Sequence, residues 1–133
     1  MTETAPEGTL PGLDSLLGVT VAEMTGERVV LTLPVQPKIH QPYGIVHGGV
    51  HCSLVESAAS MGAAVWFGDR GTVVGVSNHT DFLKAVTEGV LTAVAEPIHQ
   101  GRLQQLWLVN ITDQNDRLVA RGQVRIQNLA APS

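Results

Sequence analysis

The stretch that decides the fold of this chain is residues 47–67, HGGVHCSLVESAASMGAAVWF. Apolar and small residues fill almost all of it, which predicts a helix over residues 49–67 that ends near Gly68. Residues 39–68 contain a single Asp, Glu, Lys or Arg, and this residue is Glu56. A carboxylate in so apolar a helix is costly to bury and is rarely placed there for stability. The stretch therefore indicates both the central element of the fold and a functional side chain.

Six further segments are rich in β-branched and apolar residues and predict strands: Val19–Met24, Arg28–Leu33, Thr72–Phe82, Gly89–Ile98, Leu103–Thr112 and Arg117–Gln127. Short turns between neighbouring segments favour antiparallel pairing. The helix offers little polar surface on any side, so something must cover it all round. The predicted fold class is α+β, with one antiparallel sheet of about six strands wrapped around one long central helix.

The last of these segments shows the cleanest alternation in the chain. Every second residue from Leu118 to Ile126 is predicted to face one side of the sheet. Every second residue from Val119 to Gln127 is predicted to face the other side. The turn Asp113-Gln114-Asn115-Asp116 precedes this strand.

The chain has 133 residues, which is enough for one domain with one core. We expect a flexible tail at residues 1–12 and a single domain at residues 13–128. Leu13 to Leu17 predicts a short helical turn that ends at Gly18. Residues 34–44, with three prolines, predict an irregular loop.

Composition excludes several classes of protein. The net charge of −4 argues against a nucleic-acid binder, which needs a basic face. The single cysteine, Cys52, forms no internal disulfide. No apolar run reaches the ~18 residues of a membrane span, and residues 1–12 have no apolar core of a signal peptide. We therefore expect a cytoplasmic protein.

The helix begins at His47-Gly48-Gly49 without a Ser, Thr, Asp or Asn that could cap it. The N–H groups of its first turn are therefore predicted to be free for other acceptors. Glycine lets a ligand atom approach the backbone closely, and the helix dipole adds partial positive charge at this end. These properties suit a carbonyl oxygen that gains negative charge during acyl transfer.

Glu56 lies seven residues after Gly49, and a rise of ~1.5 Å per residue converts this spacing to roughly 10 Å along the helix. At that distance one carboxylate is not expected to act on a carbonyl bound at its own helix start. An antiparallel partner helix could supply the other half of the site. A single curled sheet also leaves strand edges open, so we expect at least a dimer with shared sites.

Simpler explanations of these features stay open at this point. Gly48-Gly49 could be a plain turn before a helix, and Glu56 could be a structural carboxylate paired across an interface. Ser60 shares the helical face of Glu56, although a lone hydroxyl in a helix is usually inert. Cys52 has no basic neighbour to activate it and is interpreted as a bystander.

Three histidines, His40, His47 and His51, invite a metal site. His47 and His51 are four residues apart, but Gly48 occupies the place where a zinc-protease helix has its glutamate. We therefore predict no metal.

The segment Gln41-Pro42-Tyr43-Gly44-Ile45-Val46-His47-Gly48-Gly49, followed by Leu54-Val55-Glu56-Ser57, resembles the hotdog-fold acyl-CoA thioesterases. The chain is most similar to the branch that includes phenylacetate-pathway, 4-hydroxybenzoyl-CoA (glutamate type) and 1,4-dihydroxy-2-naphthoyl-CoA thioesterases. The similarity extends from about Leu13 to Gln127 and implies the hotdog fold.

The resemblance also implies a role for each residue of the site. Glu56 is the nucleophile or the general base, and many relatives have aspartate in its place. The N–H of Gly48 polarises the thioester carbonyl, and the side chain of Gln41 assists near that carbonyl. His47 helps to hold the loop, and the hydroxyl of Ser60 helps to place the attacking water.

The coenzyme A contacts of the family are carried over in the same way. Asn78 lies near the substrate pocket. Some relatives have a polar or histidine residue at the position of Phe82, and Lys84 and Arg102 are expected to meet the phosphates. The contacts fall at Gly75, at Phe82-Leu83-Lys84-Ala85 and at His99-Gln100-Gly101-Arg102-Leu103-Gln104.

We therefore expect hydrolysis of an aryl or medium-chain acyl-CoA thioester to a carboxylic acid and free coenzyme A. Coenzyme A is part of the substrate, and no other cofactor is expected. The resemblance further implies a homodimer with shared active sites, packed as a dimer of dimers into a homotetramer. Two alternatives stay open: a dehydratase or hydratase of acyl thioesters on the same fold, and a non-catalytic acyl-CoA binding protein.

Overall fold

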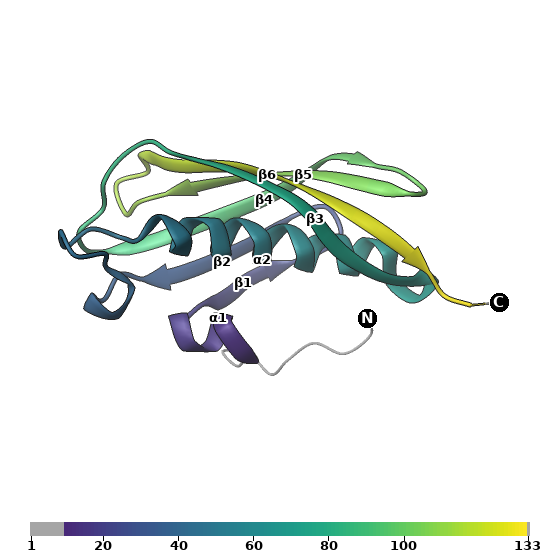
Figure 1. Cartoon of the computed structure of the whole chain (residues 1–133), viewed down its shortest axis with the longest axis horizontal. Coiled ribbons are helices and arrows are strands. Elements are labelled where there is room, and N and C mark those ends of the chain that lie inside the picture. Colours follow the sequence, from purple (N-terminus) through teal and green to yellow (C-terminus); the bar gives the residue numbers. More distant parts are fainter. Residues whose placement is uncertain (1–9, 133) are drawn as a thin grey trace.

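The computed structural model describes residues 10–132 and consists of one long helix, α2 (Gly48–Phe67), against a six-stranded sheet (Figure 1). The order in the sheet is β1-β2-β4-β5-β6-β3, and each neighbouring pair is antiparallel. The other helices are α1 (Gly12–Leu17) and the 3-10 turns η1 (Pro37–Ile39) and η2 (Gly68–Arg70). The strands are β1 (Thr20–Met24), β2 (Val29–Pro34), β3 (Gly71–Phe82), β4 (Val90–Gln100), β5 (Gln104–Thr112) and β6 (Leu118–Ala130).

Small residues let α2 lie close to the concave face of the sheet. A Cβ atom at Gly62 would overlap the indole ring of Trp107 on β5, and this indole is fully buried. Ala59 and Ala63 on neighbouring turns of α2 are also fully buried. Close packing of this kind makes even one added methyl group costly. The lack of a side chain at Gly62 therefore fixes how near the helix can approach β5.

The predicted antiparallel sheet around one long helix is confirmed, and α2 begins one residue earlier than predicted. The short N-terminal helix also ends as predicted, at Gly18, whose φ of 95° lies in the left-handed region that favours glycine. Of the predicted tail, residues 1–9 lie outside the described residues, and Gly12 begins α1.

One side-chain orientation predicted for β6 is wrong. Leu118 is 37% exposed, whereas Val119 is fully buried. The cause is irregular pairing with β5, where Ile111 pairs with Ala120 but Thr112 pairs with Leu118. Val119 is the extra residue of this β-bulge, and a bulge turns the residues on its two sides by different amounts. From Ala120 onward, the predicted alternation holds.

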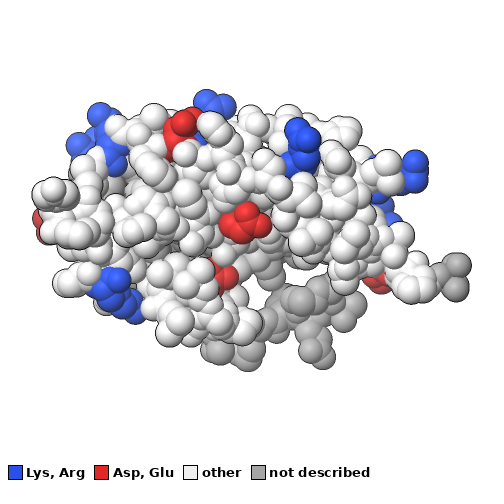
Figure 2. Space-filling model, in the orientation of Figure 1, with Lys and Arg blue, Asp and Glu red and all other residues white. Residues whose placement is uncertain are grey.

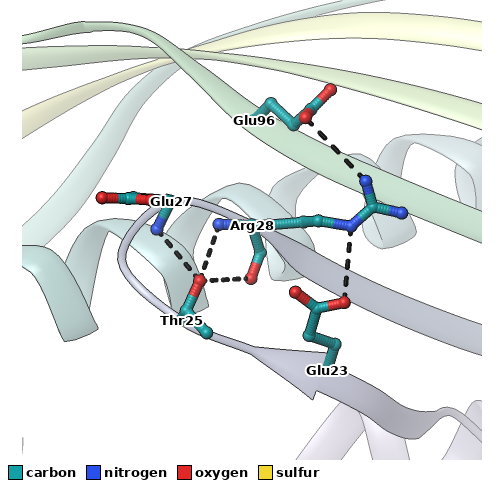
Figure 3. A network of polar contacts seen from close by, with 5 residues as sticks. All are labelled: Glu23, Thr25, Glu27, Arg28 and Glu96. Carbon is teal, nitrogen blue, oxygen red and sulfur yellow. Dashed lines mark hydrogen bonds and ion pairs between the residues drawn. The ribbon is translucent and has the colours of Figure 1, made fainter.

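The turn between β1 and β2 is held by local polar contacts (Figure 3). Thr25 Oγ1 accepts hydrogen bonds from the N–H groups of Glu27 (3.1 Å) and Arg28 (2.9 Å). The guanidinium of Arg28 lies 3.4 Å from Glu23 and 3.9 Å from Glu96 on β4. Exposed ion pairs of this kind contribute little to stability, so the turn depends mainly on the threonine hydroxyl.

A buried polar network connects α2 with two strands, β5 and β6, and with the β4–β5 turn. Gln105 Nε2 donates to the carbonyl of Ala63 (3.2 Å) and to Asn128 Oδ1 (2.9 Å). Its Oε1 accepts from Trp107 Nε1 (2.8 Å). Asn128 Nδ2 in turn donates to the carbonyl of Gly101 in the β4–β5 turn (2.9 Å). The network therefore fixes that turn relative to the C-terminal half of the helix.

The sheet has two unequal edges. β3 is 12 residues long and pairs only with β6, so one row of its backbone groups has no strand beside it within residues 10–132. β1 is five residues long, and its pairing is interrupted between Val21 and Glu23. The sheet covers one side of α2, and Val65 on the other side is 37% exposed. Within the described residues, no helix is both long and apolar enough to cross a membrane.

Candidate active site

The start of α2 is capped, contrary to the sequence prediction, and the cap is His47. Its Nδ1 accepts a hydrogen bond from the N–H of Gly49 (2.7 Å), and its carbonyl accepts from Val50 (2.9 Å). No hydrogen bond within residues 10–132 uses the N–H of Gly48. The imidazole therefore takes one of the first-turn donors and leaves the donor of Gly48 free. The side chain of His47 thus contacts the first turn of its own helix.

A cavity of about 320 Å³ lies at this helix start. The ring of Phe82 covers Gly48 so closely that a Cβ atom on the glycine would come within 2.7 Å of it. Lys84 is the one residue with a full charge at neutral pH among those that line the cavity. The lining residues are Gln41, Ile45, Val46, Gly48, His51, Phe82, Leu83, Lys84 and Ala85.

Gln41 reaches the cavity because the loop around it is tightly turned. Its N–H donates to the carbonyl of Ile45 (2.8 Å), and its carbonyl accepts from Gly44 (3.0 Å). The side-chain Oε1 accepts from the N–H of Tyr43. With its oxygen engaged in the loop, the Gln41 amide has its two N–H donors for a ligand.

The carboxylate of Glu56 lies between α2 and β3, half-buried. Asn78 Nδ2 is 3.3 Å from Oε1, and Ser60 Oγ is 3.4 Å from Oε2. Asn78 Nδ2 also donates to the carbonyl of Cys52 (3.1 Å), which fixes the amide against the helix. A Cβ atom at Gly75 would overlap Oε2 of Glu56. Gly75 therefore makes the space that the carboxylate occupies, and two long hydrogen bonds orient it.

The last group of predicted contacts lies at the other end of α2. The β4–β5 turn, with Gln100, Gly101, Arg102 and Leu103, lines a cavity of about 570 Å³ together with residues from the helix end. His99 and Gln104 flank the turn and are exposed. On the opposite wall, the guanidinium of Arg70 stacks 4.4 Å from the centre of the Trp66 ring and donates to the carbonyls of Trp66 and Phe67.

A single chain therefore brings the predicted site residues together in three groups. Glu56 does not line the cavity at the start of its own helix. The three groups are the cavity at Gly48 with Gln41 and residues 82–85, the cluster of Glu56 with Ser60, Gly75 and Asn78, and the cavity at residues 100–103.

His51 was considered in the sequence only as a metal ligand, and the structure gives it a different position. It is 3% exposed, lines the cavity at Gly48, and lies 5.9 Å from the ring of Phe82. Burial lowers the pKa of its imidazole to about 4, so the ring is neutral at pH 7. The spacing of His51 in the sequence, three residues after Gly48 and four before the buried Val55, was the signal that could have indicated this position. No group of three or more His, Cys, Asp or Glu residues suited to a metal occurs in residues 10–132.

Known proteins share both the sequence and the architecture. Residues 43–120 match the model of the thioesterase superfamily. Rv1847 of Mycobacterium tuberculosis, whose name assigns it provisionally to the esterases, is 50% identical over 130 residues, 96% of this chain and 93% of the relative. Its solved structure has a TM-score of 0.88 at 51% identity, over 90% of this chain and 98% of that one.

Two further matches carry more specific names. The 1,4-dihydroxy-2-naphthoyl-CoA hydrolase of Listeria monocytogenes is 37% identical over 108 residues, 81% of this chain and 88% of the relative. A hypothetical thioesterase protein of Streptococcus pneumoniae, solved with coenzyme A, has a TM-score of 0.78 at 26% identity, over 86% of this chain and 88% of that one. The chain therefore belongs to the thioesterase superfamily, and its fold is the hotdog fold. Its class is thioester hydrolase.

Proposed function

We propose that this protein hydrolyses acyl-CoA thioesters, at a site formed by Glu56 of one protomer and the N–H of Gly48 of another. The observation that carries the proposal is the free N–H of Gly48, which lies in a cavity that the Glu56 of the same chain does not line. A partial positive charge at the helix start suits the oxyanion of acyl transfer. A carboxylate must come from elsewhere to complete such a site.

Each group has a defined task in this reaction. The N–H of Gly48 holds the carbonyl oxygen while the carbonyl carbon becomes tetrahedral. Glu56 either attacks this carbon or takes a proton from a water that attacks it. The carbon–sulfur bond then breaks, and the thiolate of coenzyme A takes up a proton that comes from the attacking water. If Glu56 is the nucleophile, this water attacks in a second step, hydrolyses the anhydride between Glu56 and the acyl group, and so releases the carboxylic acid and restores the carboxylate. Ser60 and Asn78 support the reaction by orienting the Glu56 carboxylate, at 3.4 and 3.3 Å.

Coenzyme A is the proposed carrier because the names of two relatives, in Listeria monocytogenes and Streptococcus pneumoniae, include it. Two cations of this chain are available for its phosphates. Lys84 lines the cavity at Gly48, and Arg102 lines the cavity at the β4–β5 turn. Residues 82–85 and 99–104 are thus proposed to contact one coenzyme A from two protomers.

The free edge of β3 is the proposed contact between protomers. Val74 and Val76 on this strand are 45% and 56% exposed, and the face over α2 and β3 carries few charges (Figure 2). Two-fold pairing along β3 would reverse the partner, so its Phe82 end, with Gly48, would lie toward Gly71 of the first protomer. The further assembly into a tetramer and the cytoplasmic location remain predictions from the sequence.

The test is free-thiol release from a panel of aryl and fatty acyl-CoA esters. Glu56→Ala should lower kcat/KM by roughly 10²–10⁴-fold, because a positioned base or nucleophile contributes that much. Glu56→Asp should retain part of the activity. Glu88→Gln, which changes an exposed carboxylate in the β3–β4 loop, is the matched control and should behave like the parent protein. Undiminished turnover by the alanine variant would overturn the assignment.

The same panel separates the two alternatives left open by the sequence. A dehydratase or hydratase would change a double bond and release no thiol, and a binding protein would retain the ester intact. Dehydration on this fold usually uses a histidine with an acidic partner. No histidine within residues 10–132 hydrogen-bonds Glu56, whose two side-chain partners are Ser60 and Asn78.

A further inference from the structure

The imidazole of His51 is an unusual group in the cavity at Gly48. Its Nδ1 is shielded from solvent and has no hydrogen-bond partner, a condition shared by only one other side-chain atom of residues 10–132, Asn110 Oδ1. Leaving a buried polar atom unpaired is costly, and native proteins rarely do so without a reason. An apolar residue of similar size would avoid this cost, so stability does not explain a histidine here.

The unpaired Nδ1 also indicates where the imidazole proton lies. A neutral imidazole has one N–H and one lone pair, and an orphaned N–H is rarer in proteins than an orphaned acceptor. The favoured tautomer therefore leaves the lone pair on Nδ1 and places the proton on Nε2. Nε2 is not among the buried unpaired atoms, and His51 lines the cavity, so this N–H can reach a molecule bound there.

The position of His51 relative to Gly48 limits what the imidazole can contact. The two residues are one helical turn apart, and helical side chains lean toward the N-terminus. An acyl group whose carbonyl oxygen is bound at Gly48 would therefore pass the imidazole. The neighbouring cavity walls include Ile45, Val46 and Leu83, which are apolar. The other polar side chains that line this cavity are Gln41 and Lys84.

We propose that His51 is a specificity-determining residue, whose Nε2–H donates a hydrogen bond to an oxygen substituent on the acyl group of the thioester. The acyl class that it selects carries a hydroxyl or keto oxygen a few bonds from the carbonyl, as in 2-hydroxyaroyl or 3-hydroxyacyl thioesters. The proposal rests on the proposed thioesterase function and adds to it the chemistry of the acyl group.

The test compares matched pairs of substrates with the purified protein: 2-hydroxybenzoyl-CoA against benzoyl-CoA, and 3-hydroxybutyryl-CoA against butyryl-CoA. The parent protein should prefer the oxygenated member of at least one pair. His51→Leu should reduce that preference roughly tenfold, in the range expected for one hydrogen bond, with the unsubstituted ester little affected. His51→Gln keeps an N–H donor and should restore part of the preference.

The melting temperature separates this role from a purely structural one, because the two roles predict opposite effects of His51→Leu. His51→Leu should leave the melting temperature equal or higher, because it removes an unpaired buried group. Between pH 6.5 and 4 the unfolded chain binds a proton that His51 in the folded protein refuses, so acid destabilises the parent protein there. The leucine variant should lose less stability over this window. Lys84 is the other titratable residue that lines the cavity.

The outcomes are distinguishable. If the parent protein hydrolyses acyl-CoA esters but His51→Leu keeps the same preference for oxygenated members, the role of His51 is overturned and the proposed function stands. A marked fall in melting temperature for both variants would show a structural role and also overturn the proposal. If no acyl-CoA ester releases thiol, both proposals fail together.

Discussion

Gly75 gives the clearest case in which the absence of one side chain positions another. The carboxylate of Glu56 occupies the space that a Cβ atom at this position would fill. The obstacle is the end of a flexible side chain, so the fold can accept an alanine if the carboxylate moves. The effect of such a change should therefore appear in catalysis rather than in stability.

We predict that Gly75→Ala lowers kcat by roughly 10-fold to 100-fold, since a shift of about 1 Å in a reacting group can cost this much. The melting temperature should stay near that of the parent protein. Thr87→Ala, an exposed change in the β3–β4 loop, is the control. Steady-state kinetics and thermal melts together check the prediction, and a lowered melting temperature with an unchanged kcat would contradict it.

At the scale of single residues, the sequence singled out Glu56 but did not reveal its contacts. Glu56 was singled out because its charge is isolated in an apolar stretch. The capping role of His47 was missed because an imidazole is not among the usual capping groups. Gly75 and Glu56 are nineteen residues apart, and only the packing of β3 on α2 brings them together.

At the scale of elements, the network around Gln105 connects α2 to β5, β6 and the β4–β5 turn. We predict that Gln105→Leu lowers the free energy of unfolding by roughly 2–5 kcal/mol, because Trp107 Nε1 and Asn128 Oδ1 lose their partner while buried. Urea unfolding checks the value. Gln104→Ala, an exposed change one residue away, should have little effect, and similar losses for both variants would refute the network argument.

The strands could be predicted with near-correct bounds because alternation and turn residues are local signals. The order of the strands could not, since the paired residues of β3 and β6 are 38 to 59 positions apart in sequence. The bulge at Val119 was also missed. Leu118 and Val119 are both apolar, so composition does not reveal which of the two faces the helix.

At the scale of the whole molecule, the division of the site between protomers can be tested by mixing two inactive variants. Gly48→Pro removes the N–H that would hold the carbonyl oxygen. Proline is favoured at the first position of a helix, and His47 has φ −63° and ψ 134°, which suits a residue before proline. The substitution therefore deletes the donor with little effect expected on the helix, although the ring of Phe82 must shift.

We predict that Gly48→Pro and Glu56→Ala are each inactive alone and regain about one quarter of parental activity after co-refolding, because half of random dimers are mixed and each contains one intact site. Thiol release on the mixed sample measures the recovery. Val76→Lys on β3 should yield monomers without activity by size-exclusion chromatography and assay. Absence of recovery in verified mixed dimers would show that each chain completes its own site.

The inequality of the two sheet edges has a consequence for how far such chains can associate. A subunit with a long unpaired strand on each side could recruit neighbours without end and form filaments. Here the short, interrupted β1 offers little for a third chain to pair with. If two copies pair through β3, each buries the long free strand edge described above. Strand-by-strand association then ends at the dimer.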